Sequence, residues 1–221
     1  MSSQGSLRDG DGPGFGLIET MRWEPEQGFI RLPRHLGRLA QSAAELGLRC
    51  DLAKVERELA KVSGALPLRV RLVLSPDGLP SVTTQPFQPL PEGVVWRLGI
   101  ANARLNSADP LLRHKTTRRD TYQQARSEFT PAEADEVILL NERDEVCEGT
   151  ITNVFVDPGD GGPLLTPALS CGLLAGVLRG ELLDESAARE ATLFLADLEG
   201  AKAIFVGNSL RGLIPAELAP H

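Results

Sequence analysis

The sequence of 221 residues is poor in the residue types that mark disulfide frameworks, metal sites and membrane spans. Its three cysteines, Cys50, Cys147 and Cys171, are odd in number, far apart and without a CxxC pair, which argues against a disulfide framework and a zinc cluster. Three widely spread histidines argue against another metal site. No apolar run approaches the roughly 20 residues of a transmembrane helix, and the amino end has no apolar signal segment. We therefore expect a cytoplasmic protein with no metal and no membrane partner.

The chain also has no excess of basic over acidic residues. The chain has a net charge of −7 and a pI of about 5.1, so its overall electrostatics give no support to nucleic-acid binding. Its 42% hydrophobic and 24% charged residues are ordinary for a soluble globular protein, and a chain of this length can bury a core as one domain or two small ones. A site for a small anionic molecule stays open, because overall acidity says little about a local site.

Several nucleotide-binding and hydrolase motifs are absent. The chain has no GxGxxG followed by an acidic residue in a βαβ unit, no Walker A sequence and no nucleophile elbow. Lysine is scarce too, and one of only four, Lys115, lies in the basic run HKTTRR at residues 114–119. An arbitrary lysine is usually solvated. Like-charged neighbours lower the pKa of a lysine, however, which is what bonding of its amine to a carbonyl requires at neutral pH.

Hydrophobic periodicity predicts an α+β chain in two parts. In the first part, apolar residues recur at helical spacing after Pro33 and again after Asp51, and they alternate with arginine at residues 68–74. Strands are predicted there at 17–23, 28–32, 68–74, 82–87 and 94–101. The second part has predicted strands at 136–140, 145–147, 151–156, 164–166 and 203–206, and helices at 116–129 and 177–183. We place the boundary between an N-terminal domain of residues 1–102 and a C-terminal domain of residues 103–221.

Glu148 is an acidic residue between two apolar strands. Gly149 beside it permits a kink that would aim the carboxylate inward. A carboxylate held near a pyridine nitrogen favours the protonated ring. A strand-end carboxylate facing water is the ordinary interpretation of the same residue.

Groups for an anion such as phosphate also occur. The run GLLAGVLR at residues 172–179 predicts a helix that begins after a glycine. The N–H groups and the dipole at the start of a helix favour an anion. Arg38 would add a cation, and Asn208 and Ser209 at a strand end would add hydrogen bonds. An exposed helix arginine and a simple turn cap are the ordinary alternatives.

Together these runs resemble the class IV aminotransferase family, the fold-type IV pyridoxal-phosphate enzymes, over roughly residues 14 to 217. The resemblance is carried in order by GLIET at 16–20, RHLGRL at 34–39, EGTITNVF at 148–155, and LTP at 165–167 with GLLAGVLR at 172–179. The fold it implies is a small α/β N-terminal domain and a larger pseudo-barrel C-terminal domain, with pyridoxal 5'-phosphate between them. Homodimers are usual in this family.

The resemblance also implies roles for single residues. Lys115 is implied as the Schiff-base lysine that moves protons, and Glu148 as the partner of the pyridine nitrogen. The implied phosphate binders are Arg38, the backbone of Val177 and Leu178, and the turn of Asn208 and Ser209.

Within the family, HKTTR at 114–118 and NSLRGLIP at 208–215 are most similar to the 4-amino-4-deoxychorismate lyases, including lyase halves fused to para-aminobenzoate synthases. The implied reaction is pyridoxal-phosphate-dependent formation of 4-aminobenzoate and pyruvate, a step of folate precursor synthesis. The partner is then a small-molecule amino substrate. Candidate residues for its carboxylates are Arg22, Arg97 and Arg211, with Arg104 and Arg118 also open.

Two alternatives stay open. A branched-chain or D-amino-acid aminotransferase on the same scaffold shares every cofactor residue. A degenerate, non-catalytic homologue is suggested by the Gly-rich start, residues 1–14, which replaces the first strand of many members. Many members also place a tyrosine five residues after the lysine, to touch the phenolic oxygen of the cofactor. Here that position is Asp120, and the single tyrosine of the chain is Tyr122.

Overall fold

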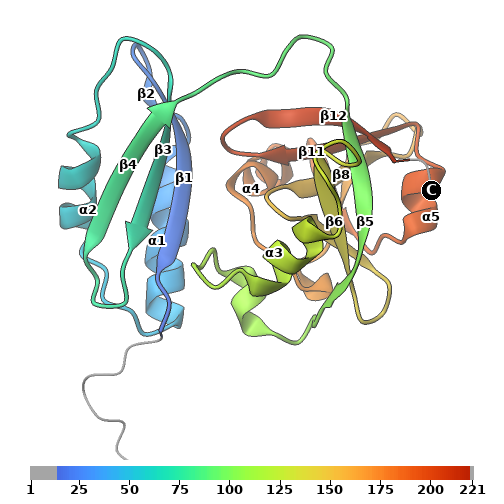
Figure 1. The fold of residues 1–221 in the computed structure, drawn as a ribbon, viewed down its shortest axis with the longest axis horizontal. Helices are drawn as coiled ribbons and strands as arrows, with labels where there is room; N and C mark the ends of the chain where they lie inside the picture. Colours follow the sequence, from blue (N-terminus) through green and yellow to red (C-terminus); the bar gives the residue numbers. More distant parts are fainter. Residues whose placement is uncertain (1–13, 220–221) are drawn as a thin grey trace, which may run out of the picture.

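The computed structural model describes residues 14–219, so the Gly-rich start up to residue 13, and with it the suggested loss of a first strand, lies outside the described range. Within that range the chain forms two sheets that lie side by side, with helices packed on each (Figure 1). The α+β class is therefore confirmed. No helix in residues 14–219 is long and apolar enough to cross a membrane.

The first sheet is antiparallel, with the order β2-β1-β3-β4. Its strands are β1 (Leu17–Glu24), β2 (Gly28–Phe29), β3 (Leu68–Leu74) and β4 (Pro80–Pro86), and its helices are α1 (Leu32–Glu45) and α2 (Leu52–Leu59). Side chains alternate between the two faces of a strand. Apolar residues on one face of β1 and β3 pack with both helices into a core that includes Met21, Leu39, Val55, Val70 and Leu72.

The opposite face of this sheet carries arginine. The register pairs Arg22 with Arg69 and Thr20 with Arg71, so these four side chains share a face. The alternation predicted for residues 68–74 is confirmed. Arg69 and Arg71 line a cavity between the two sheets, which the alternation alone did not predict.

The second sheet has the order β10-β9-β8-β11-β12-β5-β6-β7, and β7 also pairs with β8. This extra pairing, which sets Glu148 opposite Asn153, closes six strands into a barrel and leaves β9 and β10 as an extension. The pseudo-barrel fold is therefore confirmed. Its strands are β5 (Trp96–Leu105), β6 (Glu136–Asn141), β7 (Val146–Gly149), β8 (Asn153–Asp157), β9 (Leu164–Pro167), β10 (Ala188–Ala191), β11 (Ala203–Asn208) and β12 (Gly212–Leu218). Its helices are α3 (Asp120–Ser127), α4 (Val177–Asp184) and α5 (Leu195–Glu199), with 3-10 turns η1 (Pro110–Arg113) and η2 (Leu169–Cys171).

The boundary predicted between residues 102 and 103 is corrected by the structure, because it falls inside β5. The chain leaves the first sheet at Pro86 and enters the second at Trp96. The Pro-rich segment between them is the connection that Figure 1 shows running from β4 to β5. A change of sheet is set by strand pairing, which a composition pattern does not reveal.

The helix predicted at 116–129 begins only at Asp120. The residues before it are held by β1 instead: Thr116 forms a bridge with Leu17, and the carbonyl of Lys115 accepts a hydrogen bond from the backbone N–H of Ile18 at 2.7 Å. This contact ties the Lys115 segment to the first sheet.

Candidate active site

A cavity of about 560 Å³ between the two sheets brings most of the predicted residues together. Its volume is in the range that is typical of small-molecule sites. The predicted residues that line it are Arg38, Lys115, Glu148, Val177, Asn208, Ser209 and Arg211. The side chains of Leu178, Arg22 and Arg97 are not part of its lining.

Lys115 lines the cavity from the segment that is pinned to β1. A second pair of hydrogen bonds holds this segment, from the Thr117 N–H to the Gly16 carbonyl at 2.9 Å and from the Gly16 N–H to Thr117 Oγ1 at 3.0 Å. Burial lowers the pKa of Lys115 to about 8, and the guanidinium groups of Arg38 and Arg119 act in the same direction. A minority of the amine is therefore neutral near physiological pH, far more than for a lysine with the ordinary pKa of 10.5, and only the neutral form is a nucleophile.

Glu148 lies in β7 and is buried. Its Oε1 accepts hydrogen bonds from the Tyr122 hydroxyl at 2.6 Å and from the Leu174 N–H at 3.2 Å. Burial raises the pKa of Glu148 to about 7, although both hydrogen bonds and Lys115 oppose the rise. Burial also raises the pKa of Tyr122, so its hydroxyl stays a donor. A positive ligand atom beside Glu148 would restore its charge.

The turn after Glu148 is built on a second buried carboxylate, Glu136, at the start of β6. Glu136 accepts five hydrogen bonds at 2.6–3.1 Å, from the N–H and hydroxyl of Thr150, the N–H groups of Val137 and Ile151, and the hydroxyl of Thr152. A Cβ at Gly149 would lie 2.8 Å from Glu136 Oε2. The glycine is therefore needed because the turn closes around this carboxylate. Sequence reasoning had assigned Glu136 only to a strand.

Arg38 takes part in a buried chain of polar side chains. Its guanidinium donates to both oxygens of Glu19, at 2.9 and 2.6 Å. Glu19 Oε2 lies 2.6 Å from His35 Nδ1, and His35 Nε2 lies 2.8 Å from Ser209 Oγ. Burial alone would raise the pKa of Glu19, but Arg38 and His35 hold it at about 2. The chain therefore links α1 of the first sheet to the turn after β11. Glu19 and His35 lie within the GLIET and RHLGRL runs, but the resemblance implies no role for either.

Helix α4 begins at the cavity. Gly176 is its N-cap residue and offers no side chain to the first free N–H groups. A Cβ at Gly176 would collide with Asn153 Oδ1. Val177 lines the cavity, whereas Leu178 is buried and does not, so binding by the Leu178 backbone stays a prediction.

Asn208 stabilises the turn between β11 and β12. Its Oδ1 accepts from the N–H groups of Leu210 and Arg211, at 3.1 and 3.0 Å, and its Nδ2 donates to the Ile151 carbonyl at 3.2 Å. Ser209 is bonded to His35 as described. The Asn208 side chain is therefore the turn cap that the sequence had left open, and it positions the backbone around Ser209.

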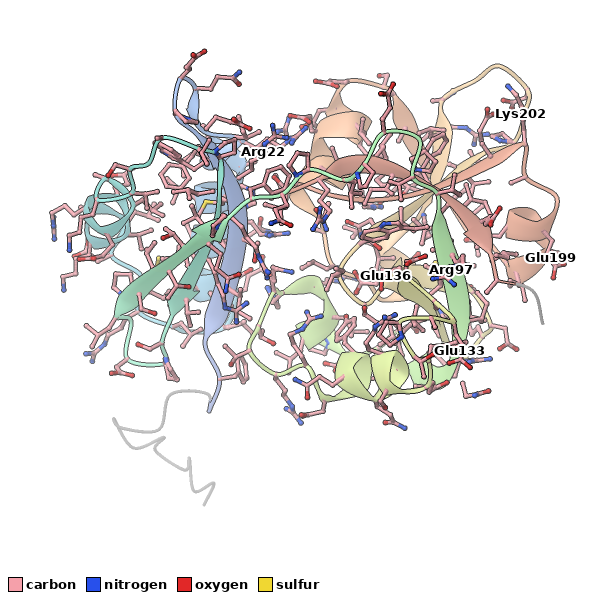
Figure 2. All side chains as sticks on the ribbon, turned by 45° about the horizontal axis from the view of Figure 1, so that its top comes forward. Arg22, Arg97, Glu133, Glu136, Glu199 and Lys202 are labelled. Atoms are coloured by element: carbon pink, nitrogen blue, oxygen red, sulfur yellow. The ribbon has the colours of Figure 1, made fainter. Side chains whose placement is uncertain are left out.

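The candidate substrate arginines separate into three groups. Arg211 and Arg118 line the cavity. Arg22 forms an ion pair with Glu24 and lines a second cavity of about 300 Å³. Arg97 is held by Asp135, with Nε 3.0 Å from Oδ2, out at β5 (Figure 2).

Arg97 and Arg104 were candidates for binding the substrate, but the structure places both outside the cavity lining. Both use their charge on the barrel surface, since Arg104 pairs with Asp144 at 3.3 Å. Two arginines that sequence reasoning assigned only to alternation, Arg69 and Arg71, line the cavity instead. Arg119, which was named only in the basic run, lines it as well. The positions of Arg69 and Arg71 follow from strand register, which a single sequence does not give.

The donor set fits pyridoxal phosphate. The cavity combines a lysine with a lowered pKa, a buried carboxylate with a raised pKa, and the free N–H groups of a helix start. These are suited to an aldehyde carbon, a basic ring nitrogen and a phosphate. Gly176 leaves the helix start open to an anion.

The comparisons with known proteins agree with this geometry. A family model described as "Amino-transferase class IV" matches residues 16–218. A protein of Schizosaccharomyces pombe named "Putative aminodeoxychorismate lyase" is 30% identical over 202 residues, which cover 88% of this chain and 86% of that protein. A "Probable branched-chain-amino-acid aminotransferase" of Thermotoga maritima is 29% identical over 216 residues, 90% of this chain and 75% of that protein.

Among solved structures, a "Putative amino-acid aminotransferase" from Mesorhizobium loti is 55% identical and superposes with a TM-score of 0.90. The match covers 93% of this chain and all of that one. The motifs, the two-sheet fold with its closed barrel and the family match over residues 16–218 lead to one conclusion. The chain belongs to the class IV aminotransferase family, whose fold-type IV members depend on pyridoxal phosphate.

Proposed function

We propose that this chain is a pyridoxal-phosphate-dependent enzyme with Lys115 as its catalytic residue. The proposal depends on one observation: Lys115 and Glu148 line the same cavity, and the pKa of Lys115 is about 8 while that of Glu148 is about 7. Lys115 would hold the cofactor through its amine, and Glu148 would face the ring nitrogen. Arg38, the backbone of Val177 and Leu178, and Ser209 would bind the phosphate.

When bound, pyridoxal phosphate supplies an electron-accepting ring that stabilises negative charge on the carbon next to the substrate amine. Lys115 would act as the general base that takes the proton from this carbon. Glu148 would keep the ring nitrogen protonated. Tyr122 keeps the Glu148 carboxylate in place through the 2.6 Å hydrogen bond.

The reaction we propose is cleavage of 4-amino-4-deoxychorismate. After Lys115 takes the proton from the amine-bearing carbon, the C–O bond to the enolpyruvyl group breaks. That group leaves as the enolate of pyruvate, which takes the proton held by Lys115 and becomes pyruvate, and the ring becomes aromatic as 4-aminobenzoate. The proposal is supported by the similarity of residues 114–118 and 208–215 to such lyases and by the S. pombe relative.

An aminotransferase is the second candidate, and the names of the Mesorhizobium loti and Thermotoga maritima relatives favour it. It would use Lys115 and Glu148 in the same roles and differ only on the substrate side. In that case Lys115 would both take and return a proton, and the amino group would pass to a 2-oxo acid.

One experiment separates the two. The purified protein with added pyridoxal phosphate is incubated with 4-amino-4-deoxychorismate, and 4-aminobenzoate and pyruvate are measured by chromatography and a coupled dehydrogenase. Equal amounts of both products are expected, and Lys115→Ala should lower the rate by at least ~10²–10⁴-fold. Transfer of amino groups from amino acids to 2-oxoglutarate, with no 4-aminobenzoate formed, would overturn the lyase in favour of the aminotransferase.

The degenerate alternative and the oligomeric state have their own measurements. A protein that takes up no pyridoxal phosphate, by absorbance and by borohydride trapping at Lys115, would be a non-catalytic homologue.

We also propose a homodimer, as is usual in the family, which light scattering would show as about twice the 23.8 kDa chain mass.

A further inference from the structure

The cavity carries excess positive charge in a chain that is acidic overall. Seven arginine and lysine side chains and three acidic side chains line it, whereas the chain as a whole has a net charge of −7. Lys115 and Arg38 have roles in the proposed cofactor site. The five other basic side chains are Arg69, Arg71, Arg118, Arg119 and Arg211.

Four of these arginines come together from three separate segments. Arg69 and Arg71 are neighbours on the cavity face of β3. Arg119 precedes α3, and Arg211 lies in the turn between β11 and β12. The segments are far apart in sequence, so only the packing of the two sheets brings the four guanidinium groups to one cavity.

Two of the four are held in place by neutral groups. Arg119 donates to the Thr150 carbonyl and lies over the Tyr122 ring, 4.8 Å from its centroid. Arg211 donates to the Gln88 carbonyl at 3.3 Å and lies 5.8 Å from the centroid of the Phe87 ring. These contacts fix the planes of both guanidinium groups and leave their charges available.

None of the four forms an ion pair with a carboxylate of the described residues. Among residues 14–219, the ion pairs of arginine involve Arg22, Arg31, Arg34, Arg38, Arg97, Arg104, Arg143 and Arg179. Burial lowers the pKa of Arg71, with repulsion from Arg69 and Arg119, and it lowers that of Arg211, with repulsion from Arg69. Four like charges that repel one another in one cavity are unfavourable until an anion binds there.

We propose that Arg69, Arg71, Arg119 and Arg211 form an anion subsite that binds the carboxylates of a substrate with two carboxylates. The inference rests on the proposed function and narrows its substrate class. 4-Amino-4-deoxychorismate carries two carboxylates, whereas a branched-chain amino acid carries one carboxylate and an apolar side chain. The planar fork of arginine matches a carboxylate with two parallel hydrogen bonds.

The test uses two probes that Lys115 cannot process. Chorismate carries both carboxylates but has a hydroxyl in place of the amine, and benzoate carries a single carboxylate. Binding of each to the protein as purified, with and without pyridoxal phosphate, is measured by titration calorimetry. Arg69→Gln and Arg71→Gln are compared with Arg57→Gln, an exposed arginine of α2 that lies outside the cavity. Unfolding temperatures of all variants establish that they are folded.

The expected result is that Arg71→Gln weakens chorismate binding by roughly 10- to 100-fold, the effect of losing a charge-assisted hydrogen bond, while Arg57→Gln leaves it unchanged. Arg69→Gln should act in the same direction, and benzoate should be affected much less. Equal loss for both probes, or no loss beyond that of Arg57→Gln, would overturn the subsite. A protein that forms no 4-aminobenzoate but still prefers chorismate through these arginines would contradict the lyase and leave the subsite standing.

Discussion

Lys115 is the residue at which pH should act on this protein. Its pKa of about 8 is below the ordinary value of 10.5, so the neutral amine becomes the major form above about pH 8. We expect attachment of pyridoxal phosphate to slow by about tenfold for each pH unit below 8 and to level off above it. Stopped-flow absorbance from pH 6 to 10, with borohydride trapping and peptide mapping, measures this rate.

The matched control is Lys202→Ala, because Lys202 is exposed and pairs with Asp157 at 3.3 Å. Lys202→Ala should leave the profile as it is, while Lys115→Ala should abolish trapping. A rate that keeps rising up to pH 10 would contradict a lowered pKa at Lys115. The same shift affects stability: below pH 8 the folded state carries the full cost of the buried ammonium group, and this cost decreases as pH rises from 8 to 10.5.

Single residues could be predicted where chemistry alone selects them. Lys115 and Glu148 stand out because a basic run and an apolar flank are unusual settings for an isolated lysine and glutamate. Glu19, His35 and Tyr122 could not be selected in this way, since their contacts join residues that are 16 to 174 positions apart. The prediction that Arg97 binds substrate was wrong for a related reason: its partner Asp135 comes from another segment, and the sequence does not reveal this ion pair.

At the scale of elements, the turn between β7 and β8 depends on Glu136. We expect Glu136→Gln to destabilise the protein by about 2–4 kcal/mol, because an amide replaces one acceptor oxygen with a donor that faces N–H and hydroxyl donors. Urea unfolding measures the loss. The control is Glu199→Gln, an exposed residue of α5 that Figure 2 shows well away from Glu136. A loss no larger than that of the control would mean that the turn forms without this carboxylate.

Many of the elements were predicted, but β10, α5 and β12 were missed, and the pairing of the strands was not predicted at all. Alternation identified β3, and helical spacing identified α1 and α2, because each pattern reflects one buried face. The start of α3 was missed because residues 115–117 pair with β1, a tertiary contact without a local signal. Barrel closure by β7 and β8 likewise depends on long-range register.

For the whole molecule, the two sheets have separate cores joined by polar contacts. The apolar cluster of the first sheet shares no residue with those of the barrel. Between them lie ion pairs of α1 with α4, Arg31 with Glu181 at 2.6 Å and Arg34 with Asp184 at 2.7 Å. A polar interface of this kind permits the two parts to separate.

We therefore expect scanning calorimetry to show two overlapping transitions without cofactor and one sharper transition at higher temperature with pyridoxal phosphate. A ligand that contacts both parts stabilises their association, by about 2.7 kcal/mol at one hundred times its dissociation constant. Arg57→Gln should behave like the unchanged protein. A single transition of the same width in both conditions would show that the two parts are one cooperative unit without help from the cofactor.

The alternation along β3 bears on how this protein can evolve. Val70 and Leu72 pack into the core, while Arg69 and Arg71 alternate with them and line the cavity. Substitutions at the two arginines therefore leave the core packing and the Lys115 segment untouched. Glu148 has no such freedom, since the same residue contributes its carboxylate and closes the barrel opposite Asn153. A library that varies residues 69 and 71 alone should change which substrates are accepted while the cofactor chemistry is inherited unchanged.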